Sequence, residues 1–186
     1  MWPETAIPFP ILVSRFAKEL PALYRLVDSL GIPVFTGLHH LEYLDSTHAS
    51  VTSQRISIAL FVESYNSAVL VEPGYRLSPV YKKMVLVPFA ERIPYANTFR
   101  FLIEPLKWNV GISSWGKGRD TLVYSIETRT GKEVKFSAMI CYESVYPNFV
   151  REFVRRGAEF LVVITNDSWW GNTSGTYQHA SYASFR

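Results

Sequence analysis

Hydrophobic positions near the start of the chain recur every three or four residues and then change to the pattern of strands. The helical spacing predicts a helix over Phe16–Leu30. Pro21 interrupts the pattern, which predicts a kink or the start of a second helix at that point. Gly31 and a following proline are typical of a helix end, so Val34–Leu38 is predicted to be a short strand.

Apolar runs bounded by turn residues predict further strands along the rest of the chain. These predicted strands are Arg55–Glu63, Ser67–Glu72, Met84–Val87, Thr121–Thr128, Glu133–Ile140 and Phe160–Thr165. The segment Arg129–Lys132 contains Gly131 and separates two of these runs, which indicates a β-hairpin.

The segment Pro147–Arg156 has the strongest helical pattern in the sequence. Proline suits the first turn of a helix, and Gly157 is a typical residue after its end. One apolar face is predicted there, made by Phe149, Val150, Phe153 and Val154. Helices that alternate with strands and hairpins favour an α/β layered fold. No repeat or linker divides the sequence, so residues 1–186 are expected to form one domain.

Composition excludes several classes of protein. Of the 186 residues, 48% are hydrophobic and 19% are charged, which excludes an intrinsically disordered chain. The single cysteine excludes a disulfide framework and a multi-cysteine zinc site. The net charge of +3 comes from scattered basic residues, so no nucleic-acid partner is expected.

The two ends of the sequence predict that the chain is part of a longer protein. No apolar run reaches the roughly 20 residues that a membrane-spanning helix needs, so no such helix is expected in this chain. Met1–Pro8 opens without a preceding strand, and Ser181–Arg186 is typical of the middle of a helix. We therefore expect a domain that is cut at both ends.

Cys141 is the first candidate for chemistry. It follows the apolar strand that ends at Ile140 and stands just before a helix, and such a turn can expose a nucleophile to substrate. A lone cysteine is also commonly an inert buried residue, so this position alone does not establish a role. The histidines have no informative spacing relative to Cys141 and are expected to be structural or on the surface: His39, His40, His48 and His179.

Three carboxylates lie in surroundings that favour acid–base chemistry. Glu4 and Glu91 are bracketed by prolines and apolar residues, and Glu143 comes two residues after Cys141. Burial raises the pKa of a carboxyl group toward the range of a general base. An ordinary surface salt bridge is the alternative for each of them.

A polar loop with two tryptophans follows the last predicted strand. Residues Asn166–Asn172 contain turn-forming side chains, but the adjacent Trp169 and Trp170 are not needed for a turn. These two aromatic side chains are candidates for the lining of an apolar substrate pocket.

Five segments together resemble the nitrilase (carbon–nitrogen hydrolase) superfamily. They are Trp2–Pro8, Tyr81–Pro94, Ile140–Glu143, Thr165–Gly171 and Gly175–His179. Within that superfamily the likeness is greatest to the bacterial apolipoprotein N-acyltransferases, and it extends over essentially the whole chain. The resemblance implies an α-β-β-α sandwich, here incomplete at both ends.

The resemblance also implies which residues carry the chemistry. A Glu–Lys–Cys triad falls on Glu4, Lys83 and Cys141, with Lys83 preferred to Lys82 by its distance from the Leu-Val-Pro run. Supporting positions fall on Glu91, Glu143 and Tyr142, and a substrate-side aromatic falls on Trp169. Neither a metal nor another cofactor is implied.

The implied reaction moves a fatty acyl group through a thioester on the cysteine. The donor would be a membrane phospholipid and the acceptor the α-amine of a diacylglyceryl-cysteine lipoprotein. The expected location is the bacterial inner membrane, with the catalytic domain on its periplasmic side and anchors outside this chain.

Two alternatives stay open at this point. The first is a soluble amidase or nitrilase that hydrolyses carbon–nitrogen bonds with the same triad. The second is a catalytically inactive fragment that serves as an interaction domain.

Overall fold

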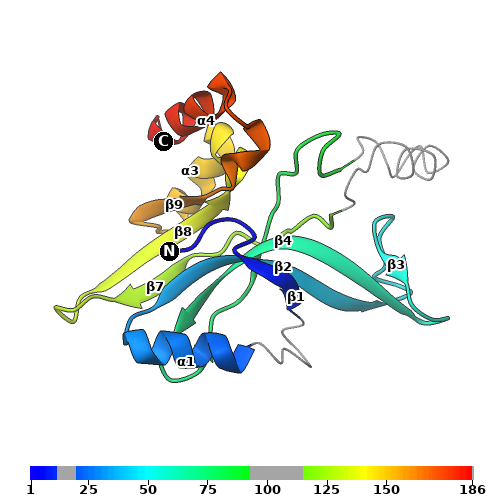
Figure 1. Ribbon diagram of the computed structural model, residues 1–186, viewed down its shortest axis with the longest axis horizontal. Coiled ribbons are helices and arrows are strands. Elements are labelled where there is room, and N and C mark those ends of the chain that lie inside the picture. The colour runs from blue at the N-terminus through cyan, green and yellow to red at the C-terminus, as the bar shows by residue number, and fades with distance from the viewer. Residues whose placement is uncertain (12–19, 93–114, 186) are drawn as a thin grey trace.

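Two β-sheets form the centre of the molecule (Figure 1), in a computed structural model that describes residues 1–11, 20–92 and 115–185. The larger sheet consists of β1 (Ile7–Ile11), β2 (Val34–Asp45), β3 (Gln54–Arg55), β4 (Leu60–Glu72), β5 (Arg76–Leu77) and β6 (Tyr81–Lys82). The smaller sheet consists of β7 (Tyr124–Glu127), β8 (Glu133–Ile140) and β9 (Phe160–Ile164). The described helices are α1 (Leu20–Leu30), α3 (Pro147–Arg155) and α4 (Ser174–Ser184), with 3₁₀ turns at Cys141–Val145 and Asp167–Trp170.

The sheets pack face to face, with helices on their outer faces (Figure 1). Between the sheets, Phe35 and Leu70 of the larger sheet meet Phe136 of the smaller sheet in one buried cluster. Side chains alternate between the two faces of a strand, so Val34 and Val69, the neighbours of two of these residues, point the other way and pack under α1. Helix α3 packs on the outer face of the smaller sheet. The α/β class and the α-β-β-α order of layers are thus confirmed.

Strand register brings distant parts of the sequence together at one end of the sheets. β2 and β4 pair antiparallel along their full lengths, and β1 runs parallel to β2. The short β6 pairs with β4 so that Lys82 lies opposite Ser67. β8 and β9 are parallel, so both end at the same edge, with Ile140 opposite Ile164. The residues that follow these two strands are therefore neighbours in space.

Several predicted elements agree with the structure. The hairpin is present between β7 and β8, and Gly131 adopts a φ of 77°, which favours glycine. Helix α3 and strand β9 lie where they were predicted. Ser181–Ser184 is helical, as predicted, but α4 ends at Ser184, so the expectation of a mid-helix segment at Ser181–Arg186 was wrong in extent.

The described part of the predicted helix Phe16–Leu30 is α1. It covers Leu20–Leu30, and Pro21 is its second described residue. Residues 16–19 lie outside the described part of the chain.

Several predicted strands were wrong in extent or in type. β2 continues past Leu38 to Asp45, and β4 runs unbroken through Ser64–Asn66, where the sequence suggested a gap. The predicted strand Arg55–Glu63 is interrupted, because β3 ends at Arg55 and β4 begins at Leu60. Met84–Val87 is not a strand. The prediction for Val154 was also wrong, because its side chain is 51% exposed while Val150 and Phe153 are buried.

Among the residues that the structure describes, no helix is both long enough and apolar enough to span a lipid bilayer.

Candidate active site

Cys141 lies at a sharp turn between β8 and the 3₁₀ turn that leads to α3. Its φ is 52°, in the left-handed region that non-glycine residues seldom occupy. A non-glycine residue in this region has a strained backbone. Backbone strain of this kind persists only where the surrounding structure holds the residue in place, and it is frequent at active sites. The partly exposed side chain thus stands beyond the end of the sheet, as the sequence predicted for a nucleophile at this position.

Lys83 is buried directly after β6, with 1% of its side chain exposed. Its Nζ lies 2.8 Å from Oε1 of Glu91 and 3.4 Å from Oε1 of Glu4. Burial alone would lower the pKa of Lys83, but the two carboxylates and Cys141 raise it above the usual value. Lys83 is therefore held as a cation.

Lys82, the neighbouring residue, points elsewhere. Its Nζ bonds to Oε2 of Glu42 at 2.5 Å and lies over the ring of Tyr65. The geometry thus brings Lys83, not Lys82, to Glu4, which agrees with the choice made from the distance to the Leu-Val-Pro run.

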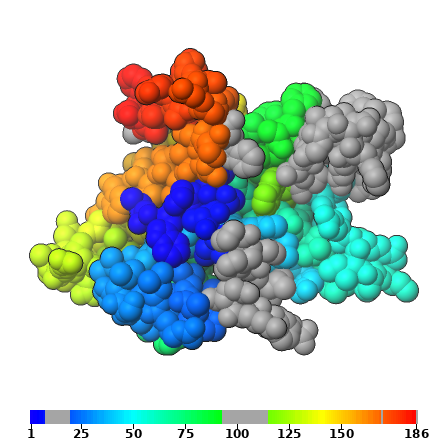
Figure 2. Space-filling view, in the orientation of Figure 1, coloured from blue at the N-terminus to red at the C-terminus, as the bar shows by residue number. Residues whose placement is uncertain are grey.

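Glu4 is positioned by a turn that rests on β2. The Pro3 carbonyl accepts from the backbone N–H of Gly37, and a Cβ atom at position 37 would lie 2.7 Å from the Cα of Glu4. Only glycine leaves room for this close approach. Figure 2 shows the N-terminal residues on the molecular surface, between α1 and the residues around β9. Oε2 of Glu4 accepts from the backbone N–H of Asn166, which follows β9, so Glu4 links the two sheets.

Asn66 is a site residue that the sequence analysis missed. Its Nδ2 donates to Oε1 of Glu4 at 2.6 Å and to Oε1 of Glu91 at 3.2 Å. Asn66 is 3% exposed, and its backbone carbonyl oxygen accepts a hydrogen bond from the backbone N–H of Lys83. It therefore holds both carboxylates against the lysine. The signal available in the sequence was a polar residue in the middle of an apolar strand.

Glu143 supports the site through the backbone. Its fully buried carboxylate accepts from the N–H groups of Met84, Val85 and Ile140, and from the hydroxyl of Tyr81 at 2.8 Å. Burial raises the pKa of Glu143, and these four donors partly offset that effect. The carboxylate fastens the segment after Lys83 to the strand that carries Cys141.

Glu91 also bonds to backbone in addition to Lys83. Its Oε2 accepts the N–H of Val87 at 2.8 Å, which closes the loop between them. The structure therefore brings Glu91 into direct contact with the lysine, whereas Glu143 lies outside that contact.

The thiol of Cys141 lies within the field of these charges. Burial and the nearby Glu4 raise its pKa, while Lys83, the hydroxyl of Thr165 and the N–H of Tyr142 lower it. The net shift is upward, so the thiol at rest keeps its proton. A proton acceptor and hydrogen-bond donors thus surround the sulfur.

The aromatic candidates differ in position. The ring of Tyr142 packs edge-on against Tyr146, 5.2 Å between centroids. Trp170 is half exposed and lies against Gly175 at the start of α4. The side chain of Trp169 lies outside what the structure describes.

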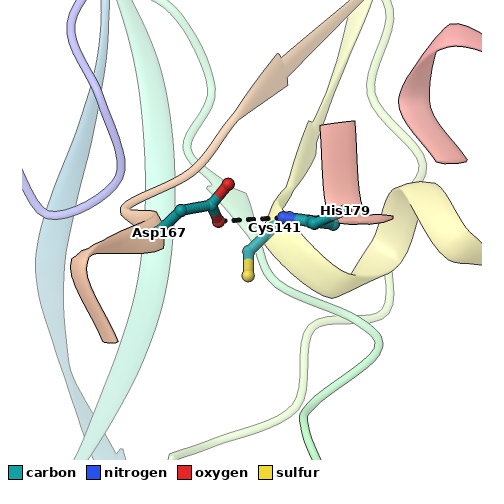
Figure 3. Close-up of side chains that lie close together, drawn as sticks. All are labelled: Cys141, Asp167 and His179. Atoms are coloured by element: carbon teal, nitrogen blue, oxygen red, sulfur yellow. Dashed lines mark hydrogen bonds and ion pairs between the residues drawn. The ribbon is translucent and has the colours of Figure 1, made fainter. Parts of the chain in front are cut away.

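A second polar cluster stands beside Cys141 (Figure 3). One donor atom each of Cys141, Asp167 and His179 lies within 4.8 Å of the others. These side-chain types can bind zinc. However, Nδ1 of His179 already lies 2.9 Å from Oδ1 of Asp167, and Thr165 donates to the same oxygen at 2.7 Å. We therefore interpret the cluster as a hydrogen-bonded network. Spacing in the sequence did not reveal that His179 lies near the cysteine.

Comparison with known families places the chain in one of them. The carbon-nitrogen hydrolase family model matches residues 1–186. The chain belongs to the carbon–nitrogen hydrolase family.

Within that family, the chain is similar to curated apolipoprotein N-acyltransferases. It is 40% identical over 182 residues to the one from Chlorobaculum tepidum, covering 97% of this chain and 34% of that protein. It is 32% identical over 183 residues to the one from Bdellovibrio bacteriovorus, covering 96% of this chain and 30% of that protein. The chain therefore spans about a third of the length of these relatives.

Solved structures similar to the chain include Nit3 of Saccharomyces cerevisiae, a member of branch 10 of the nitrilase superfamily. The sequence identity is 16%, the TM-score is 0.46, and the match covers 82% of this chain and 41% of that one. An amidase from Nesterenkonia sp. has 15% identity and a TM-score of 0.42, over 82% of this chain and 44% of that one.

Proposed function

We propose that the chain is the catalytic part of an apolipoprotein N-acyltransferase, with Cys141 as its acyl-carrying nucleophile. The observation that carries the proposal is the buried contact of Lys83 with Glu4 and Glu91 beside the strained turn of Cys141. The identity with curated apolipoprotein N-acyltransferases over nearly the whole chain supports the choice of reaction.

Glu4 is the general base in this proposal. With Lys83 charged and both carboxylates ionised, the cluster has one positive and two negative charges. Direct loss of the thiol proton to solvent would add a third negative charge. Transfer of that proton to Glu4 leaves the total unchanged, so the cluster itself favours an internal acceptor.

The thiolate of Cys141 then attacks the ester carbonyl of a phospholipid. A carbon–sulfur bond forms, and Lys83 and the N–H of Tyr142 stabilise the oxyanion. The carbon–oxygen bond breaks, and the lysophospholipid leaves with the proton held by Glu4. The product is a thioester on Cys141.

The second half-reaction consumes the thioester. The α-amine of a diacylglyceryl-cysteine lipoprotein attacks the carbonyl carbon, Glu4 accepts the amine proton, and the carbon–sulfur bond breaks. The sulfur leaves as a thiolate and takes that proton from Glu4, which restores the starting state of both groups. Trp169 and Trp170 are the proposed aromatic contacts of the acyl chain. The proposed location is the bacterial inner membrane, with this domain on the periplasmic side.

Intact-mass measurement after incubation with phospholipid vesicles tests the proposal. We expect a mass increase of one acyl chain, which hydroxylamine removes and which Cys141→Ala prevents. Addition of a diacylglyceryl-cysteine peptide should discharge the adduct and yield the N-acylated peptide. Hydrolysis of small amides without any acyl adduct from phospholipid would instead indicate an amidase and overturn the proposal.

A further inference from the structure

A cavity of about 410 Å³ lies where β4, the loop after β2 and residues 117–120 meet. Its volume is within the range of small-molecule sites, roughly 300–1,000 Å³. Cys141 does not line this cavity, so it is separate from the nucleophile. The charged side chains that line it are mostly cations: Glu63, Lys82, Arg92, Lys117, Arg119 and Asp120.

Glu63 fixes one wall of the cavity. It is 4% exposed, and its carboxylate accepts hydrogen bonds from three hydroxyl groups of the loop before β3, those of Ser50, Thr52 and Ser53. These hydroxyl donors already satisfy the buried carboxylate. Glu63 therefore anchors the loop and is not needed as an ion-pair partner for the cations of the cavity.

A second wall is the segment around Gly118, which lies flat against the residues of β6. A Cβ atom at position 118 would lie 2.0 Å from the carbonyl oxygen of Lys82, and the Gly118 N–H donates to the carbonyl of Lys83 at 2.9 Å. Only glycine leaves room for this approach. The contact fixes the backbone between Lys117 and Arg119, whose side chains line the cavity.

Three cations of the cavity have no ion-pair partner within the described ranges of the chain: Arg92, Lys117 and Arg119. Lys82 differs from them, because its Nζ pairs with Glu42 at 2.5 Å. With Glu63 held by hydroxyl groups, one exposed carboxylate at the rim, that of Asp120, stands against these three cations. Positive charge gathered in a cavity attracts an anion.

An exposed apolar turn adjoins the cavity. Leu44 lines the cavity and lies opposite Phe61 of β4, next to the turn Ile56–Leu60. The side chain of Ile56 is 54% exposed, and that of Ile58 is 86% exposed. Figure 2 shows the residues around β3, in cyan, projecting from one side of the molecule. Apolar side chains that project beside cations favour a lipid surface, where acyl chains lie below phosphate groups.

We propose that the cavity binds the phosphate of a phospholipid head group through Arg92, Lys117 and Arg119, while Ile56 and Ile58 enter the lipid surface beside it. Guanidinium and ammonium groups bind phosphate oxygens through charge-assisted hydrogen bonds. The inference goes beyond the proposed function, because this contact does not involve Cys141 and holds the domain at a lipid surface. A free phosphate would satisfy the same cations without using the two isoleucines.

Flotation with vesicles of phosphatidylglycerol and phosphatidylcholine in equal parts tests the inference. All proteins carry Cys141→Ala, so that no acyl transfer contributes. Lys117→Gln/Arg119→Gln should bind at least tenfold more weakly, since each basic residue at an anionic surface contributes about a fivefold factor. Arg129→Gln/Lys132→Gln is the matched control. It removes the same charge from the exposed turn between β7 and β8 and should weaken binding less than twofold.

Ile56→Ser/Ile58→Ser separates a lipid head group from a free phosphate. It should weaken vesicle binding at least tenfold, because the apolar side chains no longer enter the lipid. Binding of inorganic phosphate, measured by calorimetry, is the second arm. Phosphate binding that depends on Lys117 and Arg119, together with no binding to vesicles, would assign the cavity to a free phosphate and overturn the lipid contact.

Equal weakening in the cavity variant and in the Arg129→Gln/Lys132→Gln control would show a general attraction of positive charge and would also overturn the inference. Arg92→Gln provides the same comparison should Lys117→Gln/Arg119→Gln not fold. A wild type that forms no acyl adduct from phospholipid would reject the proposed function, yet vesicle binding by the Cys141→Ala proteins would be unaffected. The two failures are therefore distinguishable.

Discussion

At the scale of single residues, the candidate site depends on buried charges that compensate one another. Lys83 is in contact with two carboxylates, and Asn66 donates to both of them. Taking a charge out of water is costly unless it is paired and hydrogen-bonded. Each member of the cluster therefore depends on the others, which links the stability of the fold to the geometry of the site.

Replacement of Lys83 should be far more damaging than replacement of its neighbour. Lys83→Ala leaves Glu4 and Glu91 without their shared cation, and removal of one partner from a buried ion pair costs about 3–5 kcal/mol. Lys82 pairs with Glu42 in a partly exposed position, so Lys82→Ala should cost about 1 kcal/mol or less. Urea unfolding monitored by tryptophan fluorescence gives both values, and intact mass shows whether an acyl adduct forms.

Lys83→Met keeps the length of the side chain and serves as a second test. Like Lys83→Ala, it should form no adduct even under conditions in which it is folded. An active Lys83 variant together with an inactive Lys82→Ala would show that the roles of the two lysines have been exchanged.

At the scale of the secondary-structure elements, the site depends on how closely segments approach. The turn that carries Glu4 rests on the backbone of β2 at Gly37, and Glu143 fastens the segment after Lys83 to Ile140. Both contacts use backbone groups, so small shifts of a segment would be transmitted directly to the charged side chains.

Gly37→Ala should therefore reduce activity more than its effect on stability would explain. The added methyl group would lie 2.6 Å from the Pro3 carbonyl oxygen and 2.7 Å from the Cα of Glu4, so the turn must move. We expect at least a tenfold loss of thioester formation, since small misplacements of catalytic groups have effects of that size. The rate of acyl-adduct formation measures this loss.

Gly31→Ala is the matched control. Gly31 has a φ of 61° and no neighbour within 4 Å of an added Cβ, so the substitution strains the backbone locally without a contact to the Glu4 turn. It should destabilise the fold by about 1 kcal/mol and leave the rate of adduct formation unchanged. Equal rates in Gly37→Ala and the wild type would contradict the role assigned to the Glu4 turn.

Sequence patterns predicted the elements that follow simple spacing rules, and they failed for two segments that build the site. The hairpin, α3 and the turn at Cys141 follow from glycine, proline and apolar spacing, and they are present. Met84–Val87 has the composition of a strand, but two of its N–H groups bond to the Glu143 carboxylate. β4 was divided at Ser64–Asn66 because polar residues there break the pattern, and one of them, Asn66, belongs to the site. Local rules fail where function places a polar group inside an element.

At the scale of the whole molecule, the contact between the two sheets buries several groups that lose a proton at high pH. Tyr81 and Tyr124 lie in the core between the sheets, and Lys83 and Cys141 stand at its edge. Burial is the largest influence on the pKa of both tyrosines and of the cysteine, and it raises all three. The nearby carboxylates raise that of Lys83. All four groups therefore hold their protons more tightly in the folded state.

This distribution predicts a loss of stability at alkaline pH. The ordinary pKa values are 9.0 for the cysteine, 10.0 for the tyrosines and 10.5 for the lysine. Above these values the unfolded chain releases protons that the folded chain retains, so the free energy of unfolding falls as pH rises. Urea unfolding at pH 8, 9.5 and 11 should show a decline that steepens above pH 10.

Tyr124→Phe isolates one contribution to this decline. The change removes the hydrogen bond from the Tyr124 hydroxyl to the Pro79 carbonyl, which should cost about 1 kcal/mol at pH 8. It also removes the buried hydroxyl proton that the folded wild type retains. That retention lowers the free energy of unfolding of the wild type by up to about 1.4 kcal/mol for each pH unit above the ordinary tyrosine pKa. The wild type and the variant should therefore converge in stability, or exchange order, by pH 11. Tyr177→Phe alters an exposed ring and should leave the slope of the free energy of unfolding against pH unchanged. If Tyr124→Phe had the same slope as the wild type, the buried hydroxyl would not contribute to the loss of stability at alkaline pH.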